Sequence, residues 1–224
     1  MKVFLTGATG FIGGHLLTSL LEAGAEVRCL TRAESHLRNL QGLEVEVFTG
    51  DLRDESSFRS GLEDCEMAFH CAADYRLYSA NPDELYESNV EGTRNLMRAA
   101  SACGVKRVVY TSSVGALGLN PDGTPADEDT PVTLDDMVGH YKRSKFLAER
   151  VADEWVEKGL PIVIVNPSTP VGEADLKPTA TGQMIVDFLN RKTPAYVDTG
   201  LNLVDVHDVA LGHVRAAERG RVGE

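Results

Sequence analysis

A glycine-rich stretch near the start of the chain constrains its fold more than any other feature. Gly7, Gly10 and Gly13 recur at every third position. Residues 2–5 are apolar and β-favouring, which predicts a buried strand, and the apolar residues after the glycines have helical spacing. Backbone N–H groups at the start of such a helix are unpaired and carry partial positive charge. The stretch predicts a pyrophosphate cradle, although a tight turn without a ligand has the same pattern.

Composition limits the classes of protein that fit. The chain has 224 residues, 42% of them hydrophobic, which suits one large domain, or one domain with a small appendage. Its 22 basic and 34 acidic residues give a net charge of −12, which argues against nucleic acid or an anionic membrane as a partner. The apolar runs are too short to span a bilayer, and no signal peptide is visible.

The four cysteines are scattered along the chain and show neither metal-ligand nor Cys-x-x-Cys spacing. We therefore expect no metal site. Free thiols of this kind fit a reduced, cytoplasmic location.

Strands and helices alternate over the first three quarters of the chain. After the first strand and helix, strands are expected at residues 26–31, 45–48, 67–73, 107–111 and 160–166, and helices at residues 82–104 and 140–158. The strands are nearly continuous apolar runs, as in sheets that are buried on both faces. The pattern predicts an α/β fold with a doubly wound parallel sheet, helices on both faces and a surface loop at residues 120–131.

The pattern loosens after residue 166. A helix over residues 181–189, short strands near Tyr196 and Leu203, and a last helix over residues 208–219 are expected there. We predict a dinucleotide-binding domain over residues 1–166 and a partial substrate-binding lobe over residues 167–224. The lobe is expected to interleave with the first domain rather than to fold independently.

The residues that follow the second strand bear on the choice of cofactor. An acidic side chain there would accept hydrogen bonds from an adenosine ribose and repel a 2′-phosphate. Here Thr31 is followed by Arg32, and the first carboxylate is Glu34. Because a guanidinium binds phosphate bidentately, we favour NADP(H) over NAD(H), with His36 or Arg38 as possible helpers. Arg32 could equally be an ordinary solvated surface charge.

Three further positions lie at predicted strand ends. Asp51 could reach an adenine amino group, or could cap a helix that begins near Glu55. The small side chains of Ala72 and Ala73 leave room for a ligand, which open α/β sheets bind at that edge. His70 lies within the strand and is interpreted as a satisfied core histidine rather than a general base.

Tyr141 and Lys145 are four residues apart on a predicted helix, so they share one face. A nearby ammonium stabilises tyrosinate and is expected to lower the pKa of Tyr141 towards the range of a working acid or base. Ser113, at the end of a neighbouring strand, could donate a hydrogen bond to a substrate carbonyl oxygen. A tyrosine–lysine pair alone is common on surfaces, so the prediction depends on the glycine turn and the serine.

Taken together, these motifs resemble the extended short-chain dehydrogenase/reductase superfamily, which has a Rossmann fold. The residues that carry the resemblance are Thr6-Gly7-x-x-Gly10-x-x-Gly13, Asp51-Leu52, His70-x-Ala72-Ala73, Asn89-x-x-Gly92-Thr93, Ser113, Tyr141-x-x-x-Lys145 and Asn166-Pro167. More narrowly, residues 72–77, 139–145 and 166–172 resemble the hopanoid-associated sugar epimerases, a group similar to the dihydroflavonol reductases.

The resemblance implies a role for each site residue. Tyr141 would be the acid/base, Lys145 would bind the nicotinamide ribose, and Ser113, or less readily Ser112, would polarise the substrate oxygen. The candidate cofactor-binding residues are Gly7, Thr9, Gly10, Phe11, Ile12, Gly13, Arg32, Asp51, Leu52, Ala72, Ala73, Tyr141, Lys145, Pro167 and Thr169. The candidate substrate-facing residues are Asp74, Tyr75 and Arg76, which otherwise form an ordinary polar loop.

Three functions remain open. The first is an NADP(H)-dependent carbonyl reductase, the second a sugar epimerase that oxidises and re-reduces one carbon, and the third a non-catalytic dinucleotide sensor. Dehydration is set aside because Ser113-Val114 stands where sugar dehydratases carry an acidic pair. Members of this superfamily usually continue for about a hundred residues more, so the substrate lobe is expected to be incomplete. A small-molecule substrate and possibly a homodimer are the expected partners.

Overall fold

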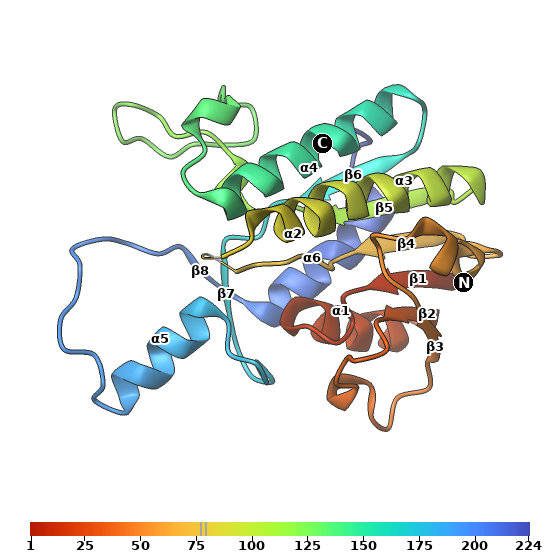
Figure 1. Ribbon diagram of the computed structural model, residues 1–224, viewed down its shortest axis with the longest axis horizontal. Coiled ribbons are helices and arrows are strands. Elements are labelled where there is room, and N and C mark those ends of the chain that lie inside the picture. The colour runs from red at the N-terminus through yellow and green to blue at the C-terminus, as the bar shows by residue number, and fades with distance from the viewer. Residues whose placement is uncertain (77, 79) are drawn as a thin grey trace.

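A six-stranded parallel sheet forms the centre of the molecule (Figure 1). The computed structural model describes residues 1–76, 78 and 80–224. The strands are β1 (Lys2–Thr6), β2 (Glu26–Thr31), β3 (Glu46–Thr49), β4 (Met67–His70), β5 (Arg107–Thr111) and β6 (Ile162–Val165). Their order is β3-β2-β1-β4-β5-β6, so the connections change direction between β1 and β4. At such a switch point, ligands bind beyond the carboxyl ends of the strands.

Helices cover both faces of this sheet. They are α1 (Phe11–Glu22), α3 (Gly92–Ala102), α4 (His140–Glu157) and α6 (Val206–Arg219). Two further helices are α2 (Pro82–Tyr86), which packs beside α4, and α5 (Ala180–Leu189), none of whose residues is buried. A π-helical turn, Glu87–Glu91, joins α2 to α3. Short 3-10 helices occupy Arg38–Leu40, Glu55–Ser57, Arg59–Leu62, Val114–Ala116 and Leu134–Asp136. None of the helices in the described part of the chain is long and apolar enough to cross a membrane.

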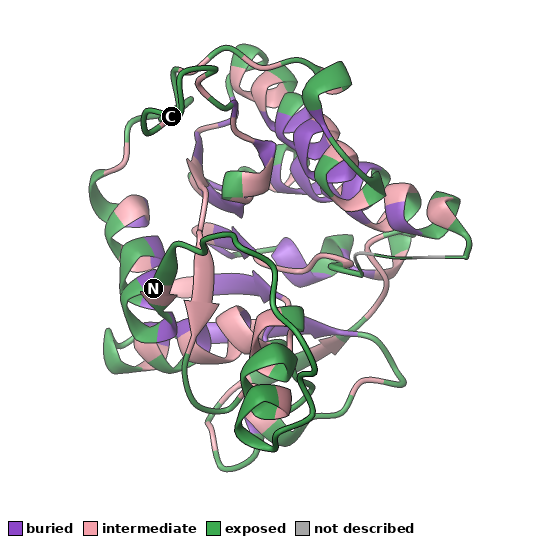
Figure 2. Ribbon diagram, turned by 90° about the vertical axis from the view of Figure 1, so that its left-hand side faces the viewer, coloured by how far each residue is buried: buried purple, intermediate pink, exposed green. Residues whose placement is uncertain are grey.

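The sheet has a separate hydrophobic core on each face. Phe4, Leu96 and Ala148 belong to the core under α3 and α4, whereas Leu5, Leu16 and Ala210 belong to the core under α1 and α6. Figure 2 shows the buried residues gathered in the strands and on the inner sides of the flanking helices. This two-sided burial explains why the strands are continuous apolar runs, and it confirms the predicted doubly wound α/β sheet.

The segment after residue 166 lies partly to one side of the sheet. A two-stranded parallel ribbon pairs β7 (Thr169–Val171) with β8 (Leu203–Asp205), and α5 extends beside it (Figure 1). The last helix, α6, returns to pack against α1 and the sheet. The division of the chain at residue 166 therefore stays a prediction, because α6 forms part of the layer that covers the sheet.

Several predicted boundaries were wrong. The strand expected near Tyr196 is irregular chain, with Tyr196 92% exposed, because no neighbouring strand pairs with it among the described residues. The strand expected over residues 67–73 ends at His70, and the strand expected over residues 160–166 spans only Ile162–Val165. The predicted helix over residues 82–104 contains the π-helical turn, which hydrophobic periodicity does not reveal.

Candidate active site

The glycine turn brings β1, α1 and the end of β4 into close contact. Gly7 has φ +81°, and a Cβ there would lie 2.6 Å from the Ala72 nitrogen. A Cβ on Gly13 would overlap the carbonyl oxygen of Gly7. Gly10 occupies the N-cap of α1 and has no side chain to occupy the free N–H groups. These features fit the pyrophosphate of a dinucleotide, because a backbone cradle of this kind has no room for side chains.

The other candidate cofactor residues flank this cradle. Thr9, Phe11 and Ile12 are half-buried at the start of α1. Gly172, just after β7, is close enough that its Cβ would lie 3.8 Å from the Phe11 ring. The segment that contains Pro167 and Thr169 thus returns towards the first turn of α1, and Pro167 accepts a hydrogen bond from the Val114 nitrogen.

Asn39 contacts the glycine turn, and the sequence did not reveal this contact. Its Nδ2 donates to the carbonyl oxygens of Thr9 at 3.2 Å and Gly10 at 3.1 Å. Gly14 leaves room for this contact, because a Cβ there would lie 2.9 Å from Asn39 Nδ2. Asn39 therefore ties the segment that follows β2 to the glycine turn. It lies in a short 3-10 helix without periodicity, so no pattern marked it.

Replacing Asn39 by alanine is expected to weaken NADPH binding about 5- to 20-fold, because two hydrogen bonds that hold the turn are lost. Fluorescence titration of NADPH would measure the Kd. Asn120→Ala is the matched control, because Asn120 also bonds to backbone oxygens but lies in the surface loop. Equal Kd values for the wild type and Asn39→Ala would show that the hydrogen bonds from Asn39 to the glycine turn have no role in binding NADPH.

Charged residues surround the edge where β2 and β3 end. Arg32 has a side chain 61% exposed, and its Nε lies 3.3 Å from Glu34 Oε1. Asp51 accepts hydrogen bonds from Arg53 Nε at 3.0 Å and Nη2 at 2.6 Å. These bonds, together with the charge of Arg32, keep the pKa of Asp51 below its usual value despite partial burial. Two guanidinium groups therefore lie near Asp51.

Further predictions for this edge concerned a capping role for Asp51 and the positions of Leu52, His36 and Arg38. The alternative role for Asp51, a helix cap, is wrong, because Asp54 accepts the capping hydrogen bond from the Ser56 nitrogen in a short 3-10 turn. Leu52 packs at the margin of the core, and its carbonyl accepts a bond from Asn95. His36 and Arg38 are exposed.

His70 is a core histidine, as expected. It is 1% exposed, and its ring nitrogens lie 2.8 Å from Thr6 Oγ1 and 2.9 Å from Thr93 Oγ1. Burial, helped by the charge of Lys145, lowers the pKa of His70 to about 3. A ring that stays neutral, with both nitrogens paired inside the core, has no role as a general base.

The polar loop after β4 is anchored by Asn89. Asn89 Oδ1 accepts from the Asp74 nitrogen at 2.7 Å, and Asn89 Nδ2 donates to the Asp74 carbonyl and to Ser144 Oγ, both at 2.9 Å. The π-helical turn between α2 and α3 contains Asn89, which is 2% exposed. The irregular turn therefore fixes the loop against α4.

Within this loop, Arg76 holds Asp74 as an ion pair, with Nε lying 2.9 Å from Oδ2 and 3.0 Å from Oδ1. Burial raises the pKa of Asp74, but hydrogen bonds from Arg76 outweigh it, and the net shift is downward. Burial, followed by the charges of Asp175 and Asp74, raises the pKa of Tyr75. The charge of Asp175, in the segment after β7, therefore reaches Tyr75 in this loop.

Ser113 and Tyr141 lie together at the carboxyl end of β5. A hydrogen bond from Ser113 lowers the pKa of Tyr141, but burial outweighs it, so the pKa lies above that of free tyrosine. Ser113 Oγ also accepts from the Gly115 nitrogen at 3.0 Å. Ser112 is buried, at 5% exposed. Ser113 is therefore the serine beside the candidate acid.

Lys145 is 2% exposed and donates to Tyr110 Oη at 3.0 Å and to the Thr111 carbonyl at 2.7 Å. Burial lowers the pKa of Lys145 to about 8. The expectation that this ammonium lowers the pKa of Tyr141 was wrong. The reason is geometric, because the ammonium is held by β5 and burial dominates at Tyr141.

A buried carboxylate supports the same cluster. Asn166 Nδ2 donates to Glu149 Oε2 at 3.0 Å and to the Ser113 carbonyl at 3.2 Å. Glu149 is 7% exposed and raises the pKa of Lys145 through its charge. It was missed, although an acidic residue one helical turn beyond Lys145 was a visible signal.

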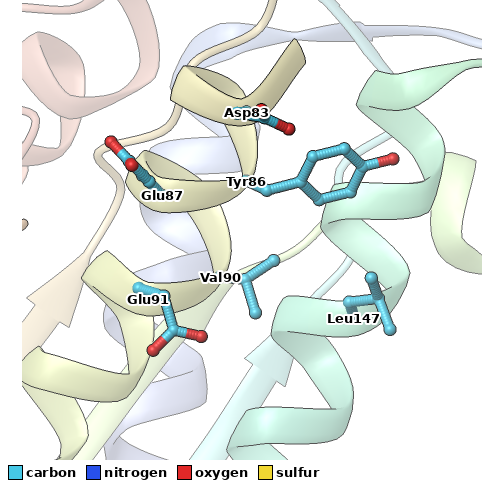
Figure 3. Close-up of a pocket in the computed structure, with 6 residues that line it drawn as sticks. All are labelled: Asp83, Tyr86, Glu87, Val90, Glu91 and Leu147. Carbon is cyan, nitrogen blue, oxygen red and sulfur yellow. The ribbon is translucent and has the colours of Figure 1, made fainter.

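A shallow surface hollow lies away from this cluster. It encloses about 350 Å³ between α2, the π-helical turn and α4, and Figure 3 shows Tyr86, Val90 and Leu147 between these helices. Its other lining residues are Asp83, Glu87 and Glu91. None of these is a candidate site residue, so the hollow is separate from the site. No group of metal-ligating side chains occurs within the described ranges.

Comparisons with known proteins agree with this geometry. A model of the NAD dependent epimerase/dehydratase family matches residues 3–224. A putative dihydroflavonol 4-reductase of Synechocystis is 49% identical over 97% of this chain and 63% of its own length. Sterol demethylase protein B of Methylococcus capsulatus is 38% identical over 100% of this chain and 68% of its own. The chain thus spans about two thirds of these relatives.

Solved structures match the chain in the same way, over most of its length and part of theirs. The structure of gox2253 is 50% identical with a TM-score of 0.96, and the match covers 100% of this chain and 68% of that one. The UDP-glucose 4-epimerase of Thermus thermophilus, solved with NAD, is 28% identical with a TM-score of 0.85 over 97% of this chain and 74% of that one. The fold is therefore shared with gox2253 and with a UDP-glucose 4-epimerase.

Proposed function

The chain belongs to the NAD dependent epimerase/dehydratase family, and we propose that it forms the catalytic part of an NADP(H)-dependent carbonyl reductase. The observation that carries this proposal is the contact between Tyr141 and Ser113 beside a buried lysine. A proton donor, an oxyanion partner and an ammonium at the carboxyl edge of a parallel sheet are the groups that carbonyl reduction requires.

Each side chain has a separate task in the proposed mechanism. NADPH, when bound, supplies a hydride to the carbonyl carbon. Ser113 donates a hydrogen bond to the carbonyl oxygen, and Tyr141 gives that oxygen its proton as the negative charge develops. Lys145 would donate to the ribose of the nicotinamide and place a positive charge near the resulting tyrosinate. Pro167 and Thr169 would lie beside the nicotinamide.

The direction of the pKa shift at Tyr141 supports reduction as the first step. Burial raises the pKa of Tyr141, so the phenol is protonated at neutral pH and ready to act as an acid. Since reduction needs the protonated phenol and the charged Lys145 ammonium, its rate should be constant at lower pH, begin to fall as pH rises through about 8, and fall further through the pKa of Tyr141. An enzyme that begins by oxidising an alcohol needs the opposite protonation state.

The cofactor is proposed to be NADP(H). Arg32 follows β2 at the position that would face the adenosine ribose of a bound dinucleotide, and its charge helps to lower the pKa of Asp51. Arg53, which is paired to Asp51, adds a second guanidinium. The 2′-phosphate of NADP(H) would bind between these groups, and Asp51 would face the adenine.

Arg32→Asp is expected to raise the Kd for NADPH about 10- to 100-fold and to change the Kd for NADH less than about 3-fold, because only NADPH carries the charge that a guanidinium recognises. Both affinities can be measured by fluorescence titration. Arg221→Asp is the matched control, because Arg221 is also an exposed arginine that is paired with a nearby glutamate. An unchanged preference in Arg32→Asp would remove the argument for NADP(H).

Asp74, Tyr75 and Arg76 are proposed to face the substrate, together with β7, α5 and β8 as the beginning of a substrate lobe. Asn89 holds the loop rigidly, which suits a recognition surface. Tyr75 is 44% exposed and faces Asp175, so a small polar molecule could reach both. The substrate is a small molecule with a carbonyl or hydroxyl group.

Sugar epimerisation is the second candidate, favoured by the fold shared with a UDP-glucose 4-epimerase that was solved with NAD. The purified protein separates the two. Stoichiometric consumption of added NADPH with a carbonyl compound is expected for the reductase. Tightly retained NAD, and interconversion of sugar nucleotides without a net absorbance change, would overturn the reductase in favour of the epimerase.

A further inference from the structure

The ammonium of Lys145 has a defined set of partners within the protein. Its Nζ bonds to Tyr110 Oη and to the Thr111 carbonyl, and it lies 4.7 Å from the centroid of the Tyr110 ring. An ammonium has three N–H donors. Among the described residues two of these donors have acceptors, both from β5, so their positions fix the direction of the third.

Tyr110 is itself immobilised. It is 1% exposed, lies opposite His70 in the sheet register, and its ring centroid is 5.5 Å from that of His70. His70 is in turn held by Thr6 and Thr93. A phenol packed against an immobile ring in the core cannot swing away, so its oxygen is a fixed acceptor.

Several titratable side chains surround Lys145, and burial and neighbouring charges determine their protonation states. On β4 and just after it, these groups are His70 and Cys71; on α4, they are Tyr141 and Glu149. Burial raises the pKa of Cys71 to about 11, so this thiol stays neutral, as does His70. Burial, followed by the charge of Glu149, raises the pKa of Tyr110, so its phenol stays protonated.

Tyr110 is thus a neutral acceptor beside a buried cation. An ammonium out of water needs such acceptors to remain charged, because desolvation alone favours the neutral amine. Glu149 supplies a compensating charge, and Tyr110 and Thr111 supply direct hydrogen bonds.

We propose that Tyr110 is a positioning residue that keeps the Lys145 ammonium charged and directs its third N–H towards the dinucleotide site. The identity of that ligand rests on the proposed function, whereas the effect of Tyr110 on the ammonium does not. Tyr110 acts through Lys145 and touches neither cofactor nor substrate in this role. The proposal adds to the reaction a tyrosine that the motif around Tyr141 does not contain.

Titration of the 224-residue chain, labelled with ¹⁵N-lysine and without added dinucleotide, tests the proposal. The Lys145 Nζ signal is identified by its loss in Lys145→Met, and its midpoint in the wild type is expected at about 8. Tyr110→Phe should lower that midpoint by about one pH unit or more, because a hydrogen bond to a charged group is lost. Tyr86→Phe, which removes a phenol bonded to His140, should leave it unchanged. An unchanged midpoint in Tyr110→Phe would overturn the proposal.

A second measurement uses the wild type, in case Tyr110→Phe does not fold. The ¹³Cζ signal of Tyr110 should shift with the same midpoint as Lys145, and this shift should vanish in Lys145→Met. A Tyr110 signal that does not respond to the Lys145 titration would overturn the proposal.

Binding of NADPH separates this proposal from the proposed function. The Kd of Tyr110→Phe for NADPH should exceed that of the wild type about 3- to 10-fold at pH 8. At pH 6.5 the two Kd values should be similar, because Lys145 is then charged in both proteins. A purely structural defect would weaken binding equally at both pH values and would contradict the proposal. If the wild type bound no nicotinamide dinucleotide, the proposed function would fail, and the lysine midpoints would still decide the role of Tyr110.

Discussion

Tyr141→Phe should lower kcat about 10²- to 10⁴-fold, the range that a positioned general acid contributes. The substitution removes only the phenol oxygen, so the ring still fills its half-buried position on α4. The Kd for NADPH should change less than about 3-fold, because the glycine turn and Lys145 are untouched. The measurement is NADPH consumption with the carbonyl compound that the wild type reduces fastest, together with fluorescence titration of the cofactor.

Tyr86→Phe serves as the control for this prediction, since Tyr86 lies on α2 and bonds to His140 outside the cluster. It should retain wild-type turnover. If Tyr141→Phe kept the wild-type kcat for every carbonyl that is reduced, Tyr141 would not be the proton donor and the proposed mechanism would fail.

Gly13→Ala should lower the free energy of unfolding by about 3 kcal/mol or more and abolish NADPH binding, because the new methyl group would overlap backbone atoms that cannot rotate away. The overlapping atom is the Gly7 carbonyl oxygen, and the Gly7 carbonyl carbon would lie 2.6 Å away. Relief would require α1 to move off β1, which would open the core under α1 and α6. Urea unfolding and cofactor titration measure the two effects.

Gly212→Ala is the matched control for this prediction. Gly212 is also a helical glycine, in α6, but a Cβ there would meet nothing within 4 Å. Alanine at such a site stabilises a helix by about 0.5–1 kcal/mol. Opposite signs for the two variants are expected. A Gly13→Ala protein as stable as the wild type would mean that the turn is looser than the contacts of Gly13 indicate.

The architecture of the sheet could be predicted because its physical cause is local and repetitive. A parallel strand buried on both faces is a continuous apolar run, and β2 and β5 have the bounds that such runs predicted. The interruption of the helix over residues 82–104 could not be predicted, because a single wide turn hardly changes the hydrophobic pattern. That turn nevertheless contains Asn89, which anchors the polar loop after β4.

Parts of the candidate site could also be predicted, because helical spacing fixes which side chains share a face. Tyr141 and Lys145 were placed on one face in this way, and their roles stay predictions. The acceptors of the Lys145 ammonium could not be predicted, since Tyr110 on β5 and Lys145 on α4 meet only through tertiary packing. Likewise, the pKa direction at Tyr141 depends on burial, which is a property of the folded molecule.

A crystal structure of this chain with NADP(H) tests the central claim most directly. The account predicts that the diphosphate lies on the turn of Gly7, Gly10 and Gly13, with a ribose hydroxyl within hydrogen-bond distance of Lys145 Nζ. The nicotinamide C4 should face a space that is bordered by Ser113 and Tyr141. A dinucleotide bound elsewhere, or a nicotinamide turned away from Tyr141, would contradict hydride transfer at this site.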